Sequence, residues 1–334
     1  MSRVTILMPV YNGEEFLRET MESVLKQSFA DFIFLIINDG STDETEQIIL
    51  SFADSRIHYL KNDTNLGLVK TLNKGIELVE TEFLARMDAD DLWVETKLEK
   101  QIALLDNRPD VGICGTSIRK FGAFEGDFFF PVENAGLKAG FLFFCCMSHP
   151  SVVFRMSFLH ETGLRYREDY FPAEDYKMWV ESLKFTQIYN IPEKLVFYRQ
   201  HENQITQDAN SAQAILTNKV RLELLEELSV NFTEEEKSFH LNGYIYTVIR
   251  STTDYRKLAR WTNTLLQCNK KNAFVFPEPQ FKQTLTKQVQ GGYYGYVKQK
   301  YFSGSHTLGM LNYLVSLDWV YLRMKLSLKL LLGM

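Results

Sequence analysis

Three carboxylates fall within four consecutive residues of the chain, in the run Asp88-Ala89-Asp90-Asp91. They directly follow Phe83–Met87, an apolar segment typical of a buried strand. Like charges this close repel one another unless a cation or water relieves the repulsion, and carboxylates suit Mg²⁺ and Mn²⁺. The run therefore indicates a site for a divalent metal ion. The alternative is an acidic cap on a helix beginning at Leu92, which would explain Asp91 alone.

A second polar turn, Asn38 to Asp43 (NDGSTD), follows the apolar segment Phe32–Asn38. Gly40 and the serine after it permit a tight turn, and Asp43 can cap the next helix. These roles leave Asp39 at the tip of the strand, free to accept hydrogen bonds from a base or a ribose. The alternative, a turn and cap without a ligand, explains Asp43 better than Asp39.

The elements that must position these residues alternate between strand-like and helix-like segments. Strands are predicted at Val4–Met8, Phe32–Asn38, Ile57–Leu60, Phe83–Met87 and Val111–Ser117, with amphipathic helices between them. This pattern predicts an α/β fold, a mostly parallel open sheet with flanking helices, whose ligands bind at the carboxyl ends of the strands. Those ends are Pro9–Gly13, Asp39–Asp43, Lys61–Gly67 and Asp88–Asp91.

The rest of the chain is less regular. Strands are predicted at Asp127–Phe130, Ser151–Phe154, Thr186–Asn190 and Leu195–Arg199, and helices at Glu133–Phe144 and Glu174–Leu183. We interpret the aromatic runs Phe128–Phe130 and Phe141–Phe144 as packing in the core or in an acceptor groove. A mainly helical pattern follows. We predict a catalytic domain of residues 1–205 and a smaller helical C-terminal region of residues 206–334.

Composition excludes some classes of function. The chain has 334 residues, 45% of them hydrophobic, and a net charge of −5, which argues against a general nucleic-acid binder. No C-x-x-C pair occurs among the four cysteines, and no run reaches the roughly 20 apolar residues of a membrane span. We expect a cytoplasmic protein. The apolar, basic tail Trp319–Met334 could lie on the inner face of a membrane, on a partner or on its own domain.

Four motifs in sequence order resemble those of the family 2 glycosyltransferases, which have the Rossmann-like GT-A fold. They are Val4–Gly13 (VTILMPVYNG), Ile36–Asp43 (IINDGSTD), Asn65–Gly75 (NLGLVKTLNKG) and Ala85–Asp91 (ARMDADD), and the resemblance extends to about Gln204. It implies a metal-dependent, inverting transfer of a sugar from a nucleotide diphosphate sugar, a UDP-sugar above all. The implied acceptor is a glycan or lipid-linked glycan in polysaccharide biosynthesis. The segment Leu66-Gly67-Leu68 departs from the family, because many members have more glycine there.

The resemblance also implies roles for single residues on the donor side. Pro9, Tyr11 and Asp39 would line the nucleoside pocket, and Lys70 would lie near the diphosphate. Asp88 would contact the ribose or metal-bound water. Two residues are implied as ligands of Mn²⁺ or Mg²⁺, Asp90 and His201, the latter close to Arg199 in the sequence.

On the acceptor side, Pro172–Trp179 (PAEDYKMW) resembles the family's Glu-Asp segment. Asp175 would be the general base that takes the proton of the acceptor hydroxyl, ahead of its neighbour Glu174. The alternative is that both acids merely begin a helix. His149 is assigned to the acceptor side, and Arg199 could pair with the diphosphate.

Three other functions were weighed against this one. A nucleotidyltransferase would carry a glycine-rich, basic phosphate loop after the first strand, where this chain has Pro9–Gly13. A dinucleotide-dependent dehydrogenase would carry G-x-G-x-x-G there. A catalytically silent nucleotide-binding or scaffold protein that keeps the fold is opposed by the joint presence of Asp39, Asp88, Asp90 and Asp175.

Overall fold

The computed structural model describes residues 2–201, 212–242, 251–273 and 275–301. The chain divides into two compact units, Met1–Phe141 with Cys145–Val220 and Leu142–Phe144 with Arg221–Met334. The predicted boundary between residues 205 and 206 lies outside the described residues, so the domain assignment stays a prediction. The tail Trp319–Met334 also lies outside them.

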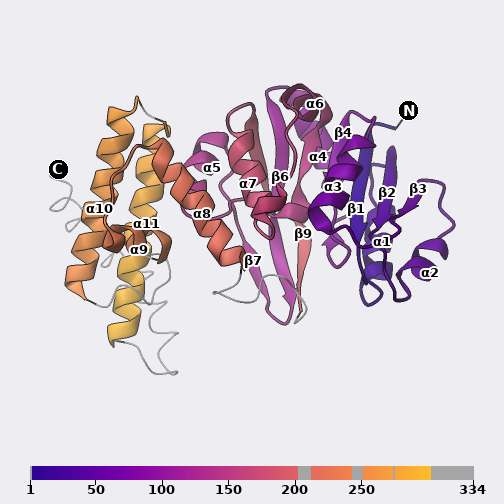
Figure 1. Ribbon diagram of the computed structural model, residues 1–334, viewed down its shortest axis with the longest axis horizontal. Helices are drawn as coiled ribbons and strands as arrows, with labels where there is room; N and C mark the ends of the chain where they lie inside the picture. Colours follow the sequence, from indigo (N-terminus) through magenta and orange to yellow (C-terminus); the bar gives the residue numbers. More distant parts are fainter. Residues whose placement is uncertain (1, 202–211, 243–250, 274, 302–334) are drawn as a thin grey trace. The chain divides into compact units, whose positions relative to one another are not determined.

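A nine-stranded sheet forms the centre of the first unit (Figure 1). The strands lie in the order β3-β2-β1-β4-β8-β6-β9-β5, and β7 pairs with β6. Their bounds are β1 Val4–Val10, β2 Phe32–Asn38, β3 Ile57–Lys61, β4 Phe83–Arg86, β5 Leu92–Trp93, β6 Val111–Gly122, β7 Gly126–Phe128, β8 Val153–Arg155 and β9 Gln187–Gln200. The α/β fold class is confirmed. The pairs among β1 to β4 are parallel, as is β6 with β9, whereas β5, β7 and β8 pair antiparallel.

Helices flank the sheet on both faces (Figure 1). Alternate residues of β1 explain this, because Ile6 and Met8 join a core with α1, whereas Leu7 faces Gly75 of α3. A β-carbon at Gly75 would lie 2.4 Å from Leu7 Cδ1, so only glycine permits this close packing. The helices of this unit are α1 Leu17–Leu25, α2 Thr45–Leu50, α3 Leu68–Glu77, α4 Lys97–Asn107, α5 Asn134–Phe141, α6 Met156–Thr162 and α7 Glu174–Ser182, with 3-10 turns η1 His149–Ser151 and η2 Glu168–Tyr170.

The interpretation of Asp91 as a helix cap before Leu92 is wrong. Leu92–Trp93 form strand β5, whose partners are Phe197 and Val196 of β9, and the following helix begins only at Lys97. The two strands predicted at Thr186–Asn190 and Leu195–Arg199 are one continuous strand, β9. Both differences arise from pairing between segments distant in sequence, which local periodicity does not register.

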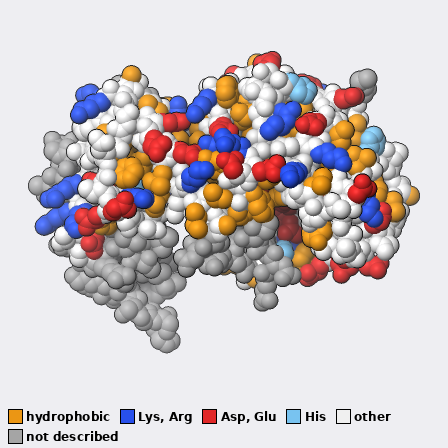
Figure 2. Space-filling model, viewed as in Figure 1, with side chains coloured by type: hydrophobic (Ala, Val, Ile, Leu, Met, Phe, Trp, Pro, Cys, Tyr) orange, Lys and Arg blue, Asp and Glu red, His pale blue; other side chains and the backbone are white. Residues whose placement is uncertain are grey.

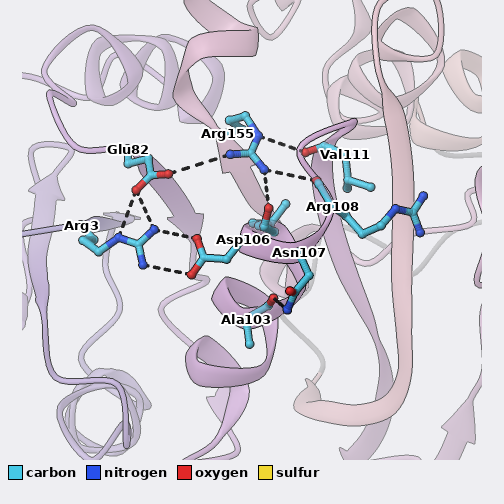
Figure 3. A network of polar contacts seen from close by, with 9 residues as sticks. Arg3, Glu82, Ala103, Asp106, Asn107, Arg108, Val111 and Arg155 are labelled. Atoms are coloured by element: carbon cyan, nitrogen blue, oxygen red, sulfur yellow. Dashed lines mark hydrogen bonds and ion pairs between the residues drawn. The ribbon is translucent and has the colours of Figure 1, made fainter.

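At the amino ends of the strands, a network of ion pairs joins four elements (Figure 3). Arg3 Nη2, just before β1, lies 2.7 Å from both Glu82 Oε2, which precedes β4, and Asp106 Oδ1 of α4. Arg155 Nη2 of β8 donates to the carbonyl of Leu105 at 2.7 Å. The charged groups of Arg3, Glu82 and Asp106 at this edge are therefore paired with one another.

The described part of the second unit is helical. Its helices are α9 Glu234–Asn242, α10 Thr252–Lys271 and α11 Glu278–Tyr301, while α8 Ala212–Glu227 runs from the first unit into the second. Buried His240 lies between the Leu142 carbonyl, 3.0 Å from its Nε2, and Trp261 Nε1, 3.4 Å from its Nδ1. Burial lowers the pKa of His240 to about 3, so this histidine is a neutral core residue. None of the described helices has the length and apolar character needed to cross a bilayer.

Candidate functional site

The loops that follow β1 and β2 are bonded to each other. Because the strands are parallel neighbours, both loops leave the same edge of the sheet. The Asn12 backbone N–H donates to Ser41 Oγ, and the Asn12 side-chain oxygen accepts from the Thr42 N–H, each at 2.9 Å. Tyr11, 50% exposed, therefore stands on a fixed loop, and Pro9 is buried in β1. Their role in a nucleoside pocket stays a prediction.

Asp39 is not a free carboxylate, so that expectation is wrong. Its side chain is almost fully buried, and Oδ1 accepts from Asn62 Nδ2 at 2.7 Å and from the Leu66 N–H at 2.9 Å. Oδ2 accepts from the Gly67 N–H at 2.9 Å. Gly67 has a φ of +88° and precedes the first residue of α3, so Asp39 fixes the start of that helix. Its contact with a nucleoside stays a prediction.

The three carboxylates after β4 converge. Asp88, Asp90 and Asp91 each offer an oxygen, and these atoms lie within 4.8 Å of one another. Asp91 is 1% exposed; its Oδ1 accepts from the Arg199 N–H at 2.8 Å, while Oδ2 has no hydrogen-bond partner in the described part of the chain. His201 Nε2 lies 3.0 Å from Asp90 Oδ2. Anionic oxygens, one of them buried and unpaired, beside an imidazole fit a divalent cation.

Burial and mutual repulsion both shift the pKa values of acids in this cluster. Burial raises the pKa of Asp91 well above its ordinary value, and the charges of Asp90 and Asp88 raise it further. Burial likewise raises the pKa of Asp88, although its ion pair with Arg86 opposes that shift. A bound cation would offset both the cost of burying these carboxylates and their mutual repulsion, which is the electrostatic argument for a metal here. In the space-filling view, acidic side chains and a histidine are visible in a hollow on the face shown (Figure 2).

Arg199 connects strand β9 to the carboxylate cluster. Its Nε donates to the Asp90 carbonyl at 2.7 Å, and its Nη2 lies 2.5 Å from Glu19 of α1. The guanidinium also lies over the rings of Phe16 and Phe121, at 4.4 Å and 4.5 Å from their centroids. The structure thus brings Arg199 to the carboxylates, whereas its contact with a diphosphate stays a prediction.

Glu174 and Asp175 begin α7, and the pKa values of both respond to the charges of Arg86 and Asp88 at the end of β4. Burial is the main cause that raises the pKa of Glu174 to about 8 and that of Asp175 to about 6. The charge of Arg86 lowers the pKa of Asp175, whereas the charge of Asp88 raises it. At neutral pH Asp175 is therefore mainly ionised beside a mainly protonated Glu174. An ionised carboxylate of this pKa is suited to accept a proton.

His149 and Tyr166 form a buried pair next to these acids. His149 Nε2 lies 2.8 Å from Tyr166 Oη. Burial lowers the pKa of His149 well below its ordinary value, so the ring is neutral. Asn73 of α3 holds Tyr166 in place, accepting from its N–H at 3.0 Å and donating to its carbonyl at 2.9 Å. Burial is the main cause that raises the pKa of Tyr166, and the charges of Asp175 and Glu174 raise it further.

Lys70 is the predicted residue with the weakest connection to this cluster. Its Nζ lies 3.5 Å from Glu168 Oε2, and both side chains are more than half exposed. Such a surface pair contributes little to stability and leaves the lysine able to move. A role of Lys70 at a diphosphate stays a prediction.

Comparison with known proteins decides the family. Residues 5–135 match the family model described as Glycosyl transferase family 2. An uncharacterized glycosyltransferase of Haemophilus influenzae is 30% identical over 237 residues, which cover 66% of this chain and 72% of that protein. The chain belongs to glycosyltransferase family 2. It is accordingly an enzyme of the glycosyltransferase class with a GT-A fold.

Other similar proteins agree with this family. WfgD of Escherichia coli, named a UDP-Glc:alpha-D-GlcNAc-diphosphoundecaprenol beta-1,3-glucosyltransferase, is 38% identical over 102 residues, 30% of this chain and 40% of that protein. The structure of S. aureus TarS 1-349 in complex with UDP-GlcNAc has a TM-score of 0.56 at 17% identity, covering 89% of this chain and 91% of that one. The mannosyltransferase PcManGT of Pyrobaculum calidifontis, in complex with GDP-Man and Mn²⁺, has a TM-score of 0.52 at 13% identity, covering 90% and 88%. At these identities the two structures show the fold alone.

Two residues of this family 2 glycosyltransferase's site were not predicted from sequence. Arg86, the last residue of β4, is 2% exposed and forms an ion pair with Asp88, while its Nε has no hydrogen-bond partner among the described residues. Tyr166 lies in a segment without a recognisable motif. A signal existed for Arg86, because a charged residue inside an otherwise apolar strand is seldom buried without a purpose. None marked Tyr166, whose position depends on Asn73.

Proposed function

We propose that this glycosyltransferase transfers a sugar from a UDP-sugar, with inversion and with a divalent cation, to a hydroxyl of a glycan or lipid-linked acceptor. The observation that carries the proposal is the cluster of Asp88, Asp90 and Asp91 after β4, with His201 3.0 Å from Asp90; Asp175 is the second acidic group. Asp175 interacts electrostatically with the Arg86–Asp88 ion pair, and Asp88 belongs to the three-carboxylate cluster. The three-carboxylate cluster can hold a cation, while Asp175 can accept a proton.

In the proposed reaction the acceptor oxygen forms a bond to the anomeric carbon as the bond from that carbon to the diphosphate oxygen breaks. The leaving diphosphate takes that electron pair, and the Asp175 carboxylate takes the hydroxyl proton. Four side chains would hold the cation: Asp88, Asp90, Asp91 and His201. When bound, Mn²⁺ or Mg²⁺ would supply charge that stabilises the leaving diphosphate. Attack from the face opposite the diphosphate inverts the anomeric centre.

The names of similar proteins support the choice of donor and acceptor. WfgD is named for UDP-Glc and for an acceptor linked to diphosphoundecaprenol, and TarS is solved with UDP-GlcNAc, whereas PcManGT is solved with GDP-Man. We therefore propose UDP as the nucleotide and a lipid-linked glycan as the acceptor class. A cytoplasmic enzyme at the inner face of a membrane is part of the same proposal.

The test is calorimetric titration of UDP and GDP, each with Mn²⁺ and with a chelator, on the wild type and on Asp90→Ala. The matched control is Asp31→Ala, an exposed aspartate that precedes β2 at the opposite edge of the sheet. We expect UDP to bind the wild type and the control only with Mn²⁺. Asp90→Ala should lose at least about tenfold in affinity, because it removes a carboxylate proposed to hold the cation. If neither nucleotide binds the folded protein with any metal, the proposal fails. Binding of UDP without any sugar transfer would favour the silent nucleotide-binding protein.

A further inference from the structure

The hairpin formed by β6 and β7, here residues 117–130, exposes three phenylalanines. Phe124 in its turn is 55% exposed, Phe128 is 38% exposed and Phe129 is 67% exposed. Of the two interpretations of the run Phe128–Phe130, packing in the core is therefore wrong for Phe128 and Phe129, and packing in an acceptor groove stays a prediction. Exposed aromatic groups this close together usually mark a surface that contacts another molecule.

These rings lie on both faces of the hairpin. The rings of Phe124 and Phe128 contact each other edge-on at 6.4 Å, and Lys120 Nζ lies 4.6 Å from the centre of the Phe128 ring. Phe129 instead faces Lys194, whose Nζ lies 5.6 Å from its ring and also donates to Asp127 Oδ2 at 2.6 Å. A flat partner could cover only one of these faces.

Basic side chains accompany the rings. Three cations, Arg119, Lys120 and Lys194, stand beside two acids, Glu125 and Asp127. Asp127 accepts from both Arg119 and Lys194, and the two cations lower its pKa to about 2. Lys120 has no carboxylate partner in the part of the chain that the structure describes. The amino group of Lys120 lies over the Phe128 ring, and a lysine beside exposed aromatic rings is typical of a bilayer surface, where its long side chain lets the charge reach a headgroup.

The hairpin leaves the sheet at the edge that carries the catalytic groups. β6 is antiparallel to β8, and β8 is antiparallel to β4, so β6 and β4 end at the same edge (Figure 1). Phe121, near the end of β6, lies under the guanidinium of Arg199, which also bonds to the Asp90 carbonyl. A surface contacted by the hairpin therefore lies on the side of the molecule that faces the acceptor.

We propose that the hairpin of residues 117–130 inserts its phenylalanines into the surface of a bilayer that contains anionic lipids. This inference rests on the proposed function, since it supplies the surface from which a lipid-linked acceptor is presented. Insertion covers rings on both faces of the hairpin at once, whereas a glycan stacked on one face leaves Phe124 with Phe128, or else Phe129, in water.

The test is co-sedimentation of the full chain with vesicles of phosphatidylcholine and phosphatidylglycerol. The variant carries Phe124→Ser, Phe128→Ser and Phe129→Ser. The matched control carries Leu50→Ser, Leu78→Ser and Phe185→Ser, three hydrophobic residues that are 64%, 48% and 58% exposed elsewhere. We expect the wild type and the control to bind alike and the hairpin variant to bind at least about tenfold more weakly, because apolar area drives insertion. Vesicles of phosphatidylcholine alone should bind the wild type less.

Two results would overturn the inference. One is wild-type protein that does not bind these vesicles, and the other is a hairpin variant that binds them as well as the control does. A hairpin variant that keeps vesicle binding but loses transfer to a water-soluble acceptor would assign the rings to a glycan instead. UDP titration on the same samples separates this outcome from failure of the proposed function. Vesicle binding should persist in Asp90→Ala, which should bind UDP at least about tenfold more weakly than the wild type.

Discussion

Replacing Glu174 with glutamine should make the protein more stable at neutral pH and should flatten the pH dependence of its stability. The Glu174 side chain is 4% exposed, and its Oε2 has no hydrogen-bond partner among the described residues. Burial, and next the charge of Asp175, raise its pKa from 4.5 to about 8. In the unfolded chain the carboxyl ionises at its ordinary pKa, so between these two values folding must take up a proton. Stability is therefore full below the unfolded pKa and falls as the pH rises toward the folded pKa.

The size of the effect follows from that interval. Each pH unit between the unfolded and the folded pKa costs about 1.4 kcal/mol of unfolding free energy. For Glu174 at pH 7 this amounts to a cost on the order of 3 kcal/mol, of which Asp175 carries a share because the two acids repel each other. Glutamine keeps the shape and the neutral charge of the protonated acid, so Glu174→Gln should recover about 2–3 kcal/mol at that pH.

The assay is urea unfolding of the wild type and Glu174→Gln at several values between about pH 5 and about pH 8. The control is Glu161→Gln, an exposed glutamate of α6, which should follow the wild type throughout. The difference between Glu174→Gln and the wild type should grow with pH. Equal stability of the two proteins at both ends of the range would refute the assignment of Glu174 as a buried, protonated acid.

Two further substitutions test the proposed catalytic base and the packing of α3 against β1. Asp175→Asn should lower kcat by about 100-fold to 10,000-fold with UDP affinity unchanged. Wild-type kcat/KM should fall about tenfold per pH unit below the Asp175 pKa of about 6, because kcat/KM reports the free enzyme. A steady-state pH profile measures both effects, and an active Asn variant would exclude Asp175 as the base. Gly75→Ala places a β-carbon 2.4 Å from Leu7 Cδ1 and should cost about 1–3 kcal/mol of stability. Thermal unfolding measures this cost, and the control is Gly136→Ala, whose β-carbon would lie 3.4 Å from its nearest atom. Equal melting temperatures of the two variants would show that the core around Leu7 rearranges to fit the added methyl group.

Prediction from sequence succeeded where the physics is local. The strand Phe32–Asn38 was placed at its observed bounds, because a continuous apolar run followed by a polar turn specifies a buried strand and its end. The clustering of Asp88, Asp90 and Asp91 followed from their adjacency after a strand. The resemblance added His201, whose Nε2 lies 3.0 Å from Asp90 Oδ2, and Asp175, and the roles of both stay predictions.

Prediction failed where a residue's role depends on a partner distant in sequence. Asp39 was expected to be free because nothing near it in sequence uses its carboxylate, yet the donors that occupy it come from Asn62, Leu66 and Gly67. For Phe128 and Phe129 the sequence left open a core or an acceptor groove, because it does not reveal which face of a hairpin has a neighbour, and their exposure excludes the core.

The sequence by itself determined which chemistry is available: acids after the strands, an imidazole and an acidic helix start. Only the tertiary structure decided how that chemistry is tuned. Burial makes Glu174 a neutral acid and leaves Asp175 ionised beside it, and Arg86 balances the charge of Asp88. The reason is that a pKa depends on the water excluded and the charges gathered around a group, and both are set by segments that meet only when the chain folds.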